Sequence, residues 1–291
     1  MKMSNIEKNL SIAQMIDIIQ KRDTIMPPEI FKYRMINDKY PLDENLHVDA
    51  LKNDKLYLSP PYRFNDPYDS VFTVDMERFK KQTVDGIEKQ VKKAAADLLV
   101  TQAGFNPNQV SNKEIMHDGI PVDKDMLTDL FDKYREVFYD EYFKSQIKFR
   151  VCCFSQTPSS ILMWSYYCDS HKGFCIGYDT SEIEEKIRKE MYPVFYHDDL
   201  FPLVKTEDGL DDGKFNALIK YSDWESEKEW RLILNEEFVE LKPSKIYLGV
   251  KFRDEYLDYF KDIAAEKNCR LYKMHMDYSR YKLKESEIEL S

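Results

Sequence analysis

In the sequence, segments with a strand-type pattern precede and follow a long, charged segment with a helix-type pattern. This order limits the folds that the chain can adopt. From about residue 71 to residue 147 the sequence has helical spacing and many charges, with breaks at GFNPN and DGIPVD. Short apolar and aromatic runs typical of strands occur before it, at EIFKYRMI, and after it, at KFRVCCFS and KGFCIGYD. One sheet must therefore collect strands from both sides. We expect an α+β fold with a split, mostly antiparallel β core, a helical insertion and flanking helices.

The expected domain organisation follows from the same pattern. Residues 5–22 place Ile, Leu and Met at helical spacings, and the pair Pro27–Pro28 ends that pattern. We therefore expect residues 1–26 to form an N-terminal helix packed on the body. Residues 27–291 are predicted to form a single α+β domain with the helical insertion at about 71–147.

Composition narrows the classes of partner. The 291 residues carry a formal net charge of −10, which disfavours broad adhesion to nucleic acid or to an anionic membrane. We expect no membrane segment, because no apolar run approaches the roughly 18 residues that a membrane-spanning helix needs. The polar start MKMSNIEKNL does not resemble a secretory signal. The odd count of five cysteines favours reduced thiols, and hence a cytoplasmic location.

The stretch SDWESEKEWRLIL, residues 222–234, places glutamates at alternate positions before an apolar run. If it is extended, one face carries Glu225, Glu227, Glu229, Arg231 and Ile233. Carboxylates that share a face about 7 Å apart repel one another, and burial then raises at least one pKa. The pattern predicts a functional carboxylate pair. Ion pairs of Glu227 and Glu229 with Arg231, Lys228 or Arg34 are an equally good structural explanation. The preceding KFNALIKYSDW is expected to be a helix.

Three other stretches offer candidate binding groups. In PPYRFNDPYD, Asn65 and Asp66 either stabilise a turn through their side chains or present polar groups to a cleft. On the first strand, Arg34 is either solvated or a phosphate anchor, because its guanidinium can donate two parallel hydrogen bonds. In FSQTPSSILMWSYY, Ser155 and Tyr166 are candidates to line a cradle for a planar ring, although the aromatic residues there can equally be core.

Metal chemistry is a weaker alternative. Asp66 and Asp69, together with a later glutamate, could hold a divalent metal as nucleases do, but no Asp/Glu-x-Lys signature accompanies them. Cys168, His171 and Cys175 have spacings compatible with zinc. The cysteines fit equally well as buried thiols and form no CxxC pair, so no metal site is predicted.

Several uncommon motifs occur in an order that identifies a family. FNDPYD, CFS, MWSYYCDSHKGFCIGYD and WESEKEWR together resemble the bacterial family called domain of unknown function 2971. This resemblance covers about residues 30–250 outside the insertion. It implies a family and almost no chemistry.

A more distant resemblance links the chain to ADP-ribosyltransferase toxins of the Arg–Ser–Glu type. Arg34 matches the arginine of the first strand, and Glu227-x-Glu229 before an apolar strand matches the final motif. FSQTPS is a loose version of the serine segment, through Phe154, Ser155, Thr157 and Ser159. Inserted residues spread this segment, and FNDPYD has no obvious toxin equivalent.

The second resemblance implies an enzyme that consumes NAD as its substrate. Glu229 would be the catalytic carboxylate, Glu227 its helper and Arg34 the phosphate anchor, with Ser155 and Tyr166 in the cleft. The partner would be a small-molecule nucleotide, and the acceptor a protein or nucleic acid. Such an enzyme could serve as a bacterial toxin or a phage-defence effector. The alternatives are a non-enzymatic ligand-sensing or interaction module and the metal-dependent nuclease. The enzyme hypothesis requires Arg34, Ser155 and Glu229 to converge on one cleft.

Overall fold

The chain is organised as two units. The computed structural model describes residues 8–103, 116–117, 120–121, 124–202 and 213–290. The first unit comprises Met1–Val71 and Ile147–Ser291, and the second is Phe72–Gln146. The second unit thus spans the helix-type segment of the sequence.

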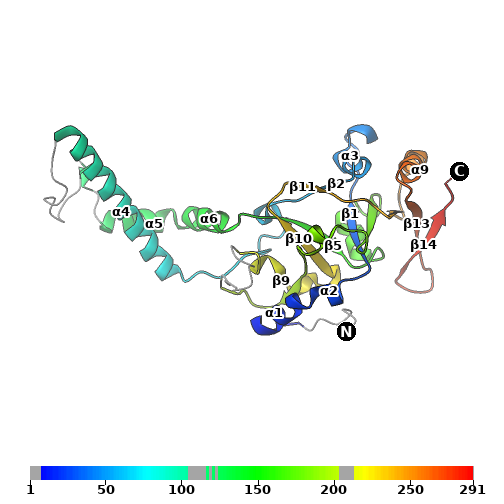
Figure 1. The fold of residues 1–291 in the computed structure, drawn as a ribbon, viewed down its shortest axis with the longest axis horizontal. Coiled ribbons are helices and arrows are strands. Elements are labelled where there is room, and N and C mark those ends of the chain that lie inside the picture. The colour runs from blue at the N-terminus through cyan, green and yellow to red at the C-terminus, as the bar shows by residue number, and fades with distance from the viewer. Residues whose placement is uncertain (1–7, 104–115, 118–119, 122–123, 203–212, 291) are drawn as a thin grey trace. The chain divides into compact units, whose positions relative to one another are not determined.

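The first unit is built on an eight-stranded sheet with the order β14-β13-β12-β6-β1-β5-β10-β7. In chain order its strands are β1 (Glu29–Arg34), β5 (Arg150–Ser155), β6 (Phe174–Asp179), β7 (Met191–Pro193), β10 (Glu229–Leu234), β12 (Lys245–Leu248), β13 (Arg270–Met276) and β14 (Leu283–Ile288). Every pairing in the sheet is antiparallel except β12 with β13. Strand β1 precedes the insertion and lies beside β5, which follows it (Figure 1). The predicted α+β class with a mostly antiparallel β core is confirmed.

Short elements surround this sheet. The helices of the first unit are α1 (Ile12–Gln20), α2 (Arg22–Ile25), α3 (Leu46–Lys52), α7 (Ile161–Tyr167), α8 (Glu185–Arg188) and α9 (Leu257–Glu266). Two small sheets pair β2 (Lys55–Tyr57) with β11 (Phe238–Glu240), and β8 (Phe195–His197) with β9 (Ile219–Tyr221). Helix α1 begins at a capping box, in which the Ser11 side chain accepts from the Gln14 N–H and the Gln14 side chain accepts from the Ser11 N–H.

The second unit contains three helices and a short hairpin among its described residues: α4 (Met76–Ala103), β3 (Met116–His117), β4 (Ile120–Pro121), α5 (Lys124–Lys133) and α6 (Arg135–Gln146). Its core is small and aromatic. Phe79, Val84, Leu127 and Phe131 are buried together, and the Phe131 ring stacks on Phe138 at a centroid distance of 5.4 Å. This unit therefore has a hydrophobic cluster of its own.

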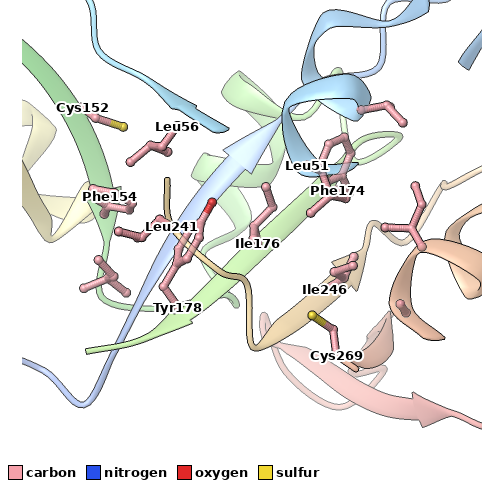
Figure 2. Packing of buried hydrophobic residues seen from close by; sticks show 14 of the residues in the cluster. Leu51, Leu56, Cys152, Phe154, Phe174, Ile176, Tyr178, Leu241, Ile246 and Cys269 are labelled. Atoms are coloured by element: carbon pink, nitrogen blue, oxygen red, sulfur yellow. The ribbon is translucent and has the colours of Figure 1, made fainter. Parts of the chain in front are cut away.

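The two faces of the eight-stranded sheet differ in composition. The main hydrophobic core covers one face with side chains such as Cys152, Phe154, Ile176 and Tyr178, which come together from β5 and β6 (Figure 2). Strand β10 adds Trp230 and Leu232 to this core. On the other face a smaller aromatic core includes Phe31, Tyr33, Trp164 and Tyr247. Because side chains alternate along a strand, Glu229 and Arg231 of β10 also face this second side.

Two local predictions are wrong. The stretch KFNALIKYSDW is not a helix but a 3₁₀ turn, Asn216–Leu218, followed by β9. Parallel pairing of β9 with β8 outweighs the local helical pattern. Residues 222–227 are not extended either, since Ser222–Glu227 form a 3₁₀ helix. Lys228 then has a left-handed φ of 48°, so β10 begins only at Glu229.

Candidate functional site

Five charged side chains are buried together in the first unit. Asp69, Lys220, Glu227, Glu229 and Arg231 are between 0% and 6% exposed. We call this group the charged cluster. Charged residues are rarely buried to this degree unless they are paired, because removing a charge from water is costly.

Arg231 organises one half of the charged cluster. Its Nη1 and Nη2 donate to the two Asp69 carboxylate oxygens at 2.8 and 2.7 Å, and its Nε donates to Glu229 Oε1 at 2.8 Å. A further bond from Nη1 reaches the Ala217 carbonyl oxygen at 2.6 Å. The guanidinium lies 5.6 Å from the centre of the Phe64 ring. The planar fork of arginine suits this two-point contact with a carboxylate.

Lys220 organises the other half. Its Nζ lies 2.5 Å from Glu227 Oε2, 2.9 Å from Glu229 Oε2 and 3.8 Å from Asp69 Oδ2. The ammonium is also 5.2 Å from the centre of the Trp224 ring. Strand β9 places Lys220 here because it pairs with β8. Lys220 therefore links Glu227 and Glu229, although Lys228 between them is left-handed.

The two glutamates have opposite pKa shifts. Burial would raise the pKa of Glu229, but Arg231 and Lys220 outweigh it and lower that pKa. Burial raises the pKa of Glu227; the Lys220 ammonium opposes this shift and the Glu229 carboxylate adds to it. When fully ionised, three carboxylates face two cations, which leaves one negative charge. A proton on Glu227 would neutralise the charged cluster.

Lys220 itself stays charged. Burial would lower its pKa, but the carboxylates of Glu229, Glu227 and Asp69 together raise it. Lys220 is therefore a fixed cation at neutral pH. Among the carboxylates of the charged cluster, Glu227 has its pKa shifted toward the protonated form.

Hydroxyl groups fix the two glutamates further. The Tyr167 hydroxyl, at the end of α7, donates to Glu227 Oε1 at 2.7 Å, and burial followed by the Glu227 charge raises the pKa of Tyr167. The Tyr196 hydroxyl accepts from the Glu229 N–H at 2.9 Å. The Ser155 hydroxyl donates to the Glu227 carbonyl oxygen at 2.7 Å. Ser155 thus holds the backbone turn that carries Glu227.

The structure brings together only part of the predicted site. Ser155 pairs in register with Glu229 and with Phe31, so these three side chains share a face of the sheet. Arg34 is an odd number of positions from Phe31 and pairs with Phe174 of the main core. Because side chains alternate along β1, Arg34 lies on the opposite face and does not meet Ser155 and Glu229 in one cleft. Together with burial, its charge lowers the pKa of His47 to about 4.

The other predicted residues lie nearer the surface. Tyr166 is 63% exposed, and its ring meets Trp224 edge-on at a centroid distance of 6.4 Å. Asn65 is exposed in the PPYRFNDPYD loop. The Asp66 carboxylate accepts from the Tyr68 N–H at 2.9 Å, which is the turn role considered from the sequence. Tyr166 therefore borders the charged cluster, whereas Asp66 stabilises its own loop.

Sequence reasoning missed the cations of the charged cluster and Tyr167 as site residues. Arg231 was considered only as an ion-pair partner, and Lys220 was assigned to a helix. One signal could have found both: each is a single cation inside an apolar run, ALIKY or WRLIL. A cation that its neighbours bury requires a carboxylate partner elsewhere in the chain.

Metal ligands and membrane spans were sought among the described residues. In that part of the chain no group of three or more His, Cys, Asp or Glu side chains is arranged to hold a metal ion. Cys168 and Cys175 are both buried, and the Cys168 thiol donates to the Phe174 carbonyl oxygen. Each helix within the same residues falls short of the length and apolarity that crossing a membrane requires.

Comparison with known proteins supports the family resemblance. Residues 163–232 match the family described as Protein of unknown function (DUF2971), which confirms the resemblance over this segment. The segment contains Tyr167, Lys220, Glu227, Glu229 and Arg231, so only Asp69 of the charged cluster lies outside it. Neither the curated proteins nor the solved structures give a match. The ADP-ribosyltransferase resemblance therefore stays a prediction.

Proposed function

We propose that the protein is an ADP-ribosyltransferase-like enzyme that consumes NAD, with Glu227 rather than Glu229 as its catalytic carboxylate. One observation carries this assignment. Glu227 is a buried acid with a raised pKa, held between the Tyr167 hydroxyl and the Lys220 ammonium. A buried carboxyl group with a raised pKa, between a hydroxyl and an ammonium, is the kind of group that serves as a general acid or base.

The reaction class sets what the carboxylate has to do. Cleavage of the nicotinamide–ribose bond develops positive charge on the ribose, and a fixed carboxylate in a desolvated site stabilises that charge. Glu227, once ionised, would supply the negative charge that stabilises the ribose, or it would deprotonate the acceptor. Glu229 would act as a positioning residue, since both of its oxygens are bonded to Arg231 and Lys220.

Aromatic rings beside the charged cluster give the proposed substrate a surface. Tyr166 is exposed, and Trp224 and Tyr167 are half-buried beside Lys220 and Glu227. A nicotinamide or adenine ring could stack on Tyr166 and Trp224. Substrate would then reach Glu227 by displacing the Tyr167 ring. Arg34 lies on the other face of the sheet, so the convergence that the toxin pattern requires is not met, and the proposed enzyme departs from that pattern by leaving Arg34 out.

The biological setting belongs to the same proposal. A protein or nucleic-acid acceptor and a role as a bacterial toxin or phage-defence effector rest on the resemblance found in the sequence. A cytoplasmic location fits the five cysteines, all of which are free thiols.

A specific observation favours a second candidate, a non-enzymatic ligand-binding module. Each charge of the charged cluster is paired with an opposite charge inside it, as a purely structural network would be. The nuclease alternative has less support. Both Asp69 oxygens are bonded to Arg231, and Asp66 stabilises a turn.

The test is nicotinamide release from NAD by the purified full chain. We expect release by the wild type and a loss of about 10²-fold or more in Glu227→Gln. Glu225→Gln is the matched control, because Glu225 lies two residues away and forms an exposed ion pair with Lys8. The Glu225→Gln variant should release nicotinamide at the rate of the wild type. Far-ultraviolet circular dichroism shows whether each variant folds.

The remaining outcomes separate the candidates. Equal rates for the wild type and Glu227→Gln would make Glu227 structural and overturn the assignment. Calorimetric binding of NAD without nicotinamide release would support the binding module. Absence of both release and binding would reject NAD as the ligand.

A further inference from the structure

The first unit also contains a pocket that is separate from the charged cluster. This pocket, of about 570 Å³, lies between the turn that joins β13 to β14, the Val250–Lys251 segment and the turn that follows α7. This volume is within the range of small-molecule sites. No residue of the charged cluster is among those that line the pocket.

A strained turn brings His171 to the pocket. Asp169, Ser170 and His171 have positive φ values of 44°, 55° and 73° in succession, which is uncommon for residues other than glycine. The His171 N–H donates to the Trp164 carbonyl oxygen at 3.0 Å, which holds the turn. A Cβ at Gly249 would lie only 2.1 Å from the His171 carbonyl oxygen, so glycine is required there. Backbone strain of this kind is often kept where it serves a ligand.

The His171 side chain has unused hydrogen-bonding capacity. Its Nε2 lies 3.2 Å from Ser165 Oγ, and its ring lies nearly parallel to Trp164, at an angle of 13°. Its Nδ1 is buried and has no hydrogen-bond partner among the described residues. A buried polar atom without a partner costs free energy, and a polar ligand atom would relieve that cost.

The charge of the pocket favours an anion. Lys251, Arg280 and Lys282 line it, although the whole chain is acidic. Asp277 also lines the pocket, but its carboxylate accepts from Ser279 and forms an ion pair with Lys284 at 2.9 Å. Arg280 Nε is 4.0 Å from Asp277, the limit of an ion pair. The positive charges are therefore not fully compensated.

The shape and polarity of the lining favour a flat, partly apolar body. Ile161, Val250 and Leu283 supply apolar surface, and Tyr278 and Tyr281 are almost fully exposed at the turn. The exposed rings of Tyr278 and Tyr281 offer faces on which a planar ring could stack.

From these features we propose that the pocket binds a nucleotide. The base lies against Tyr278, Tyr281 and the apolar lining. Lys251, Arg280 and Lys282 bind the phosphate. His171 Nδ1, which is buried in the free protein, makes a hydrogen bond to a polar atom of the ligand after a rotation of its ring exposes it. The pocket binds the nucleotide whether or not the charged cluster cleaves NAD.

Isothermal titration calorimetry of the full chain with AMP tests the proposal. Adenosine and inorganic phosphate, which each carry one part of AMP, are titrated for comparison. We expect AMP to bind, and both partial ligands to bind more weakly. Lys251→Glu and Tyr281→Ala should each weaken AMP binding about tenfold or more, which corresponds to one lost charged or stacking contact. Lys186→Glu and Tyr40→Ala, exposed positions outside the pocket, are the matched controls and should bind as the wild type does.

Four outcomes test the proposed nucleotide pocket. Weakened binding in the pocket variants alone, with Glu227→Gln unaffected, supports the nucleotide pocket even if NAD cleavage fails. No AMP binding, or equal binding by wild type and pocket variants, overturns it. Loss of AMP binding in Trp224→Ala but not in Lys251→Glu would also overturn it, and would place the nucleotide beside the charged cluster instead.

Discussion

The two faces of strand β10 are equally buried but are stabilised in different ways. On one face, Trp230 and Leu232 are 0% exposed and pack in the main hydrophobic core. On the other, Arg231 is also 0% exposed but lies among carboxylates. Apolar contacts add up roughly with buried area, whereas each buried charge depends on the presence of its partners.

This difference bears on function. A well-packed apolar face of similar volume is often at least as stabilising as a buried ion network. Stability alone therefore does not explain why charges rather than apolar side chains occupy this face. The following predictions test a chemical or binding role of the charged cluster against a purely structural one.

Arg231→Met should have the largest effect. It leaves the buried Asp69 and Glu229 carboxylates without their guanidinium partner, and we expect a loss of about 3–5 kcal/mol in the free energy of unfolding. Urea denaturation followed by tryptophan fluorescence measures it, because all three tryptophans lie in the first unit. A loss below about 1 kcal/mol would show that water or other groups replace the guanidinium.

Leu232→Ala, on the apolar face of the same strand, should cause the second-largest loss in the free energy of unfolding. It removes a fully buried side chain and leaves a cavity, so the expected loss is about 2–5 kcal/mol. The same urea titration measures it. Leu232→Met is the control, since this swap nearly conserves volume and should cost less than about 1.5 kcal/mol. A larger effect for the control would indicate that shape, and not burial, dominates this face.

Glu229→Gln and Glu227→Gln should lower the free energy of unfolding by different amounts, although the two residues are only two positions apart. Glu229 accepts charge-assisted bonds from Arg231 and Lys220, so its replacement should cost about 1.5–3 kcal/mol. Glu227→Gln should cost less than about 1 kcal/mol, because removing the surplus negative charge offsets the lost bonds. Thermal and urea unfolding of the two variants compare these values, and equal losses would contradict the pKa assignment.

The pH dependence of the same variants gives a sharper comparison. The folded pKa of Glu229 is lowered, so its contribution is present above its unfolded pKa of about 4.3 and is lost as pH falls toward the folded value. The stability gap between wild type and Glu229→Gln should therefore shrink below about pH 4.3. The folded pKa of Glu227 is raised, so its ionisation destabilises the fold as pH rises above about 4.3. Over that pH range the Glu227→Gln variant should become more stable relative to the wild type.

Arg253→Ala should have the smallest effect. Arg253 pairs with Asp38 at 2.6 Å, but both side chains are about 40% exposed, at 41% and 39%. Solvent screens such a pair and side-chain entropy opposes it. We expect no measurable change in the urea midpoint. A clear loss would show that exposed ion pairs matter here as much as the buried ones.

Part of the site could be predicted because alternation along a strand is a local property. The register of β10 with β5 places Glu229 beside Ser155, and both residues had been selected from the sequence. Glu227 also belongs to the site, but for a different reason than predicted. Its segment is a 3₁₀ helix, and Lys220 rather than strand alternation brings it to Glu229.

Arg34 shows where motif order fails as a guide. Its place on the first strand was predicted, and β1 indeed ends at Arg34. The face on which it lies depends on the register between β1 and β5, in which Phe31 and not Arg34 pairs with Ser155. A shift of one residue moves every side chain to the other face, so a short motif cannot fix the face.

The amino-acid sequence by itself determined the α+β class, the split β core and the position of the acidic stretch, because these depend on local periodicity and composition. Only the tertiary structure decided which charges meet. Asp69 and Arg231 are 162 positions apart in sequence, and their contact follows from strand order and register. Local patterns indicate that a cation will be buried. The partner is chosen by long-range packing, since the cost of burying a charge is met only by an opposite charge that the fold brings within hydrogen-bonding distance.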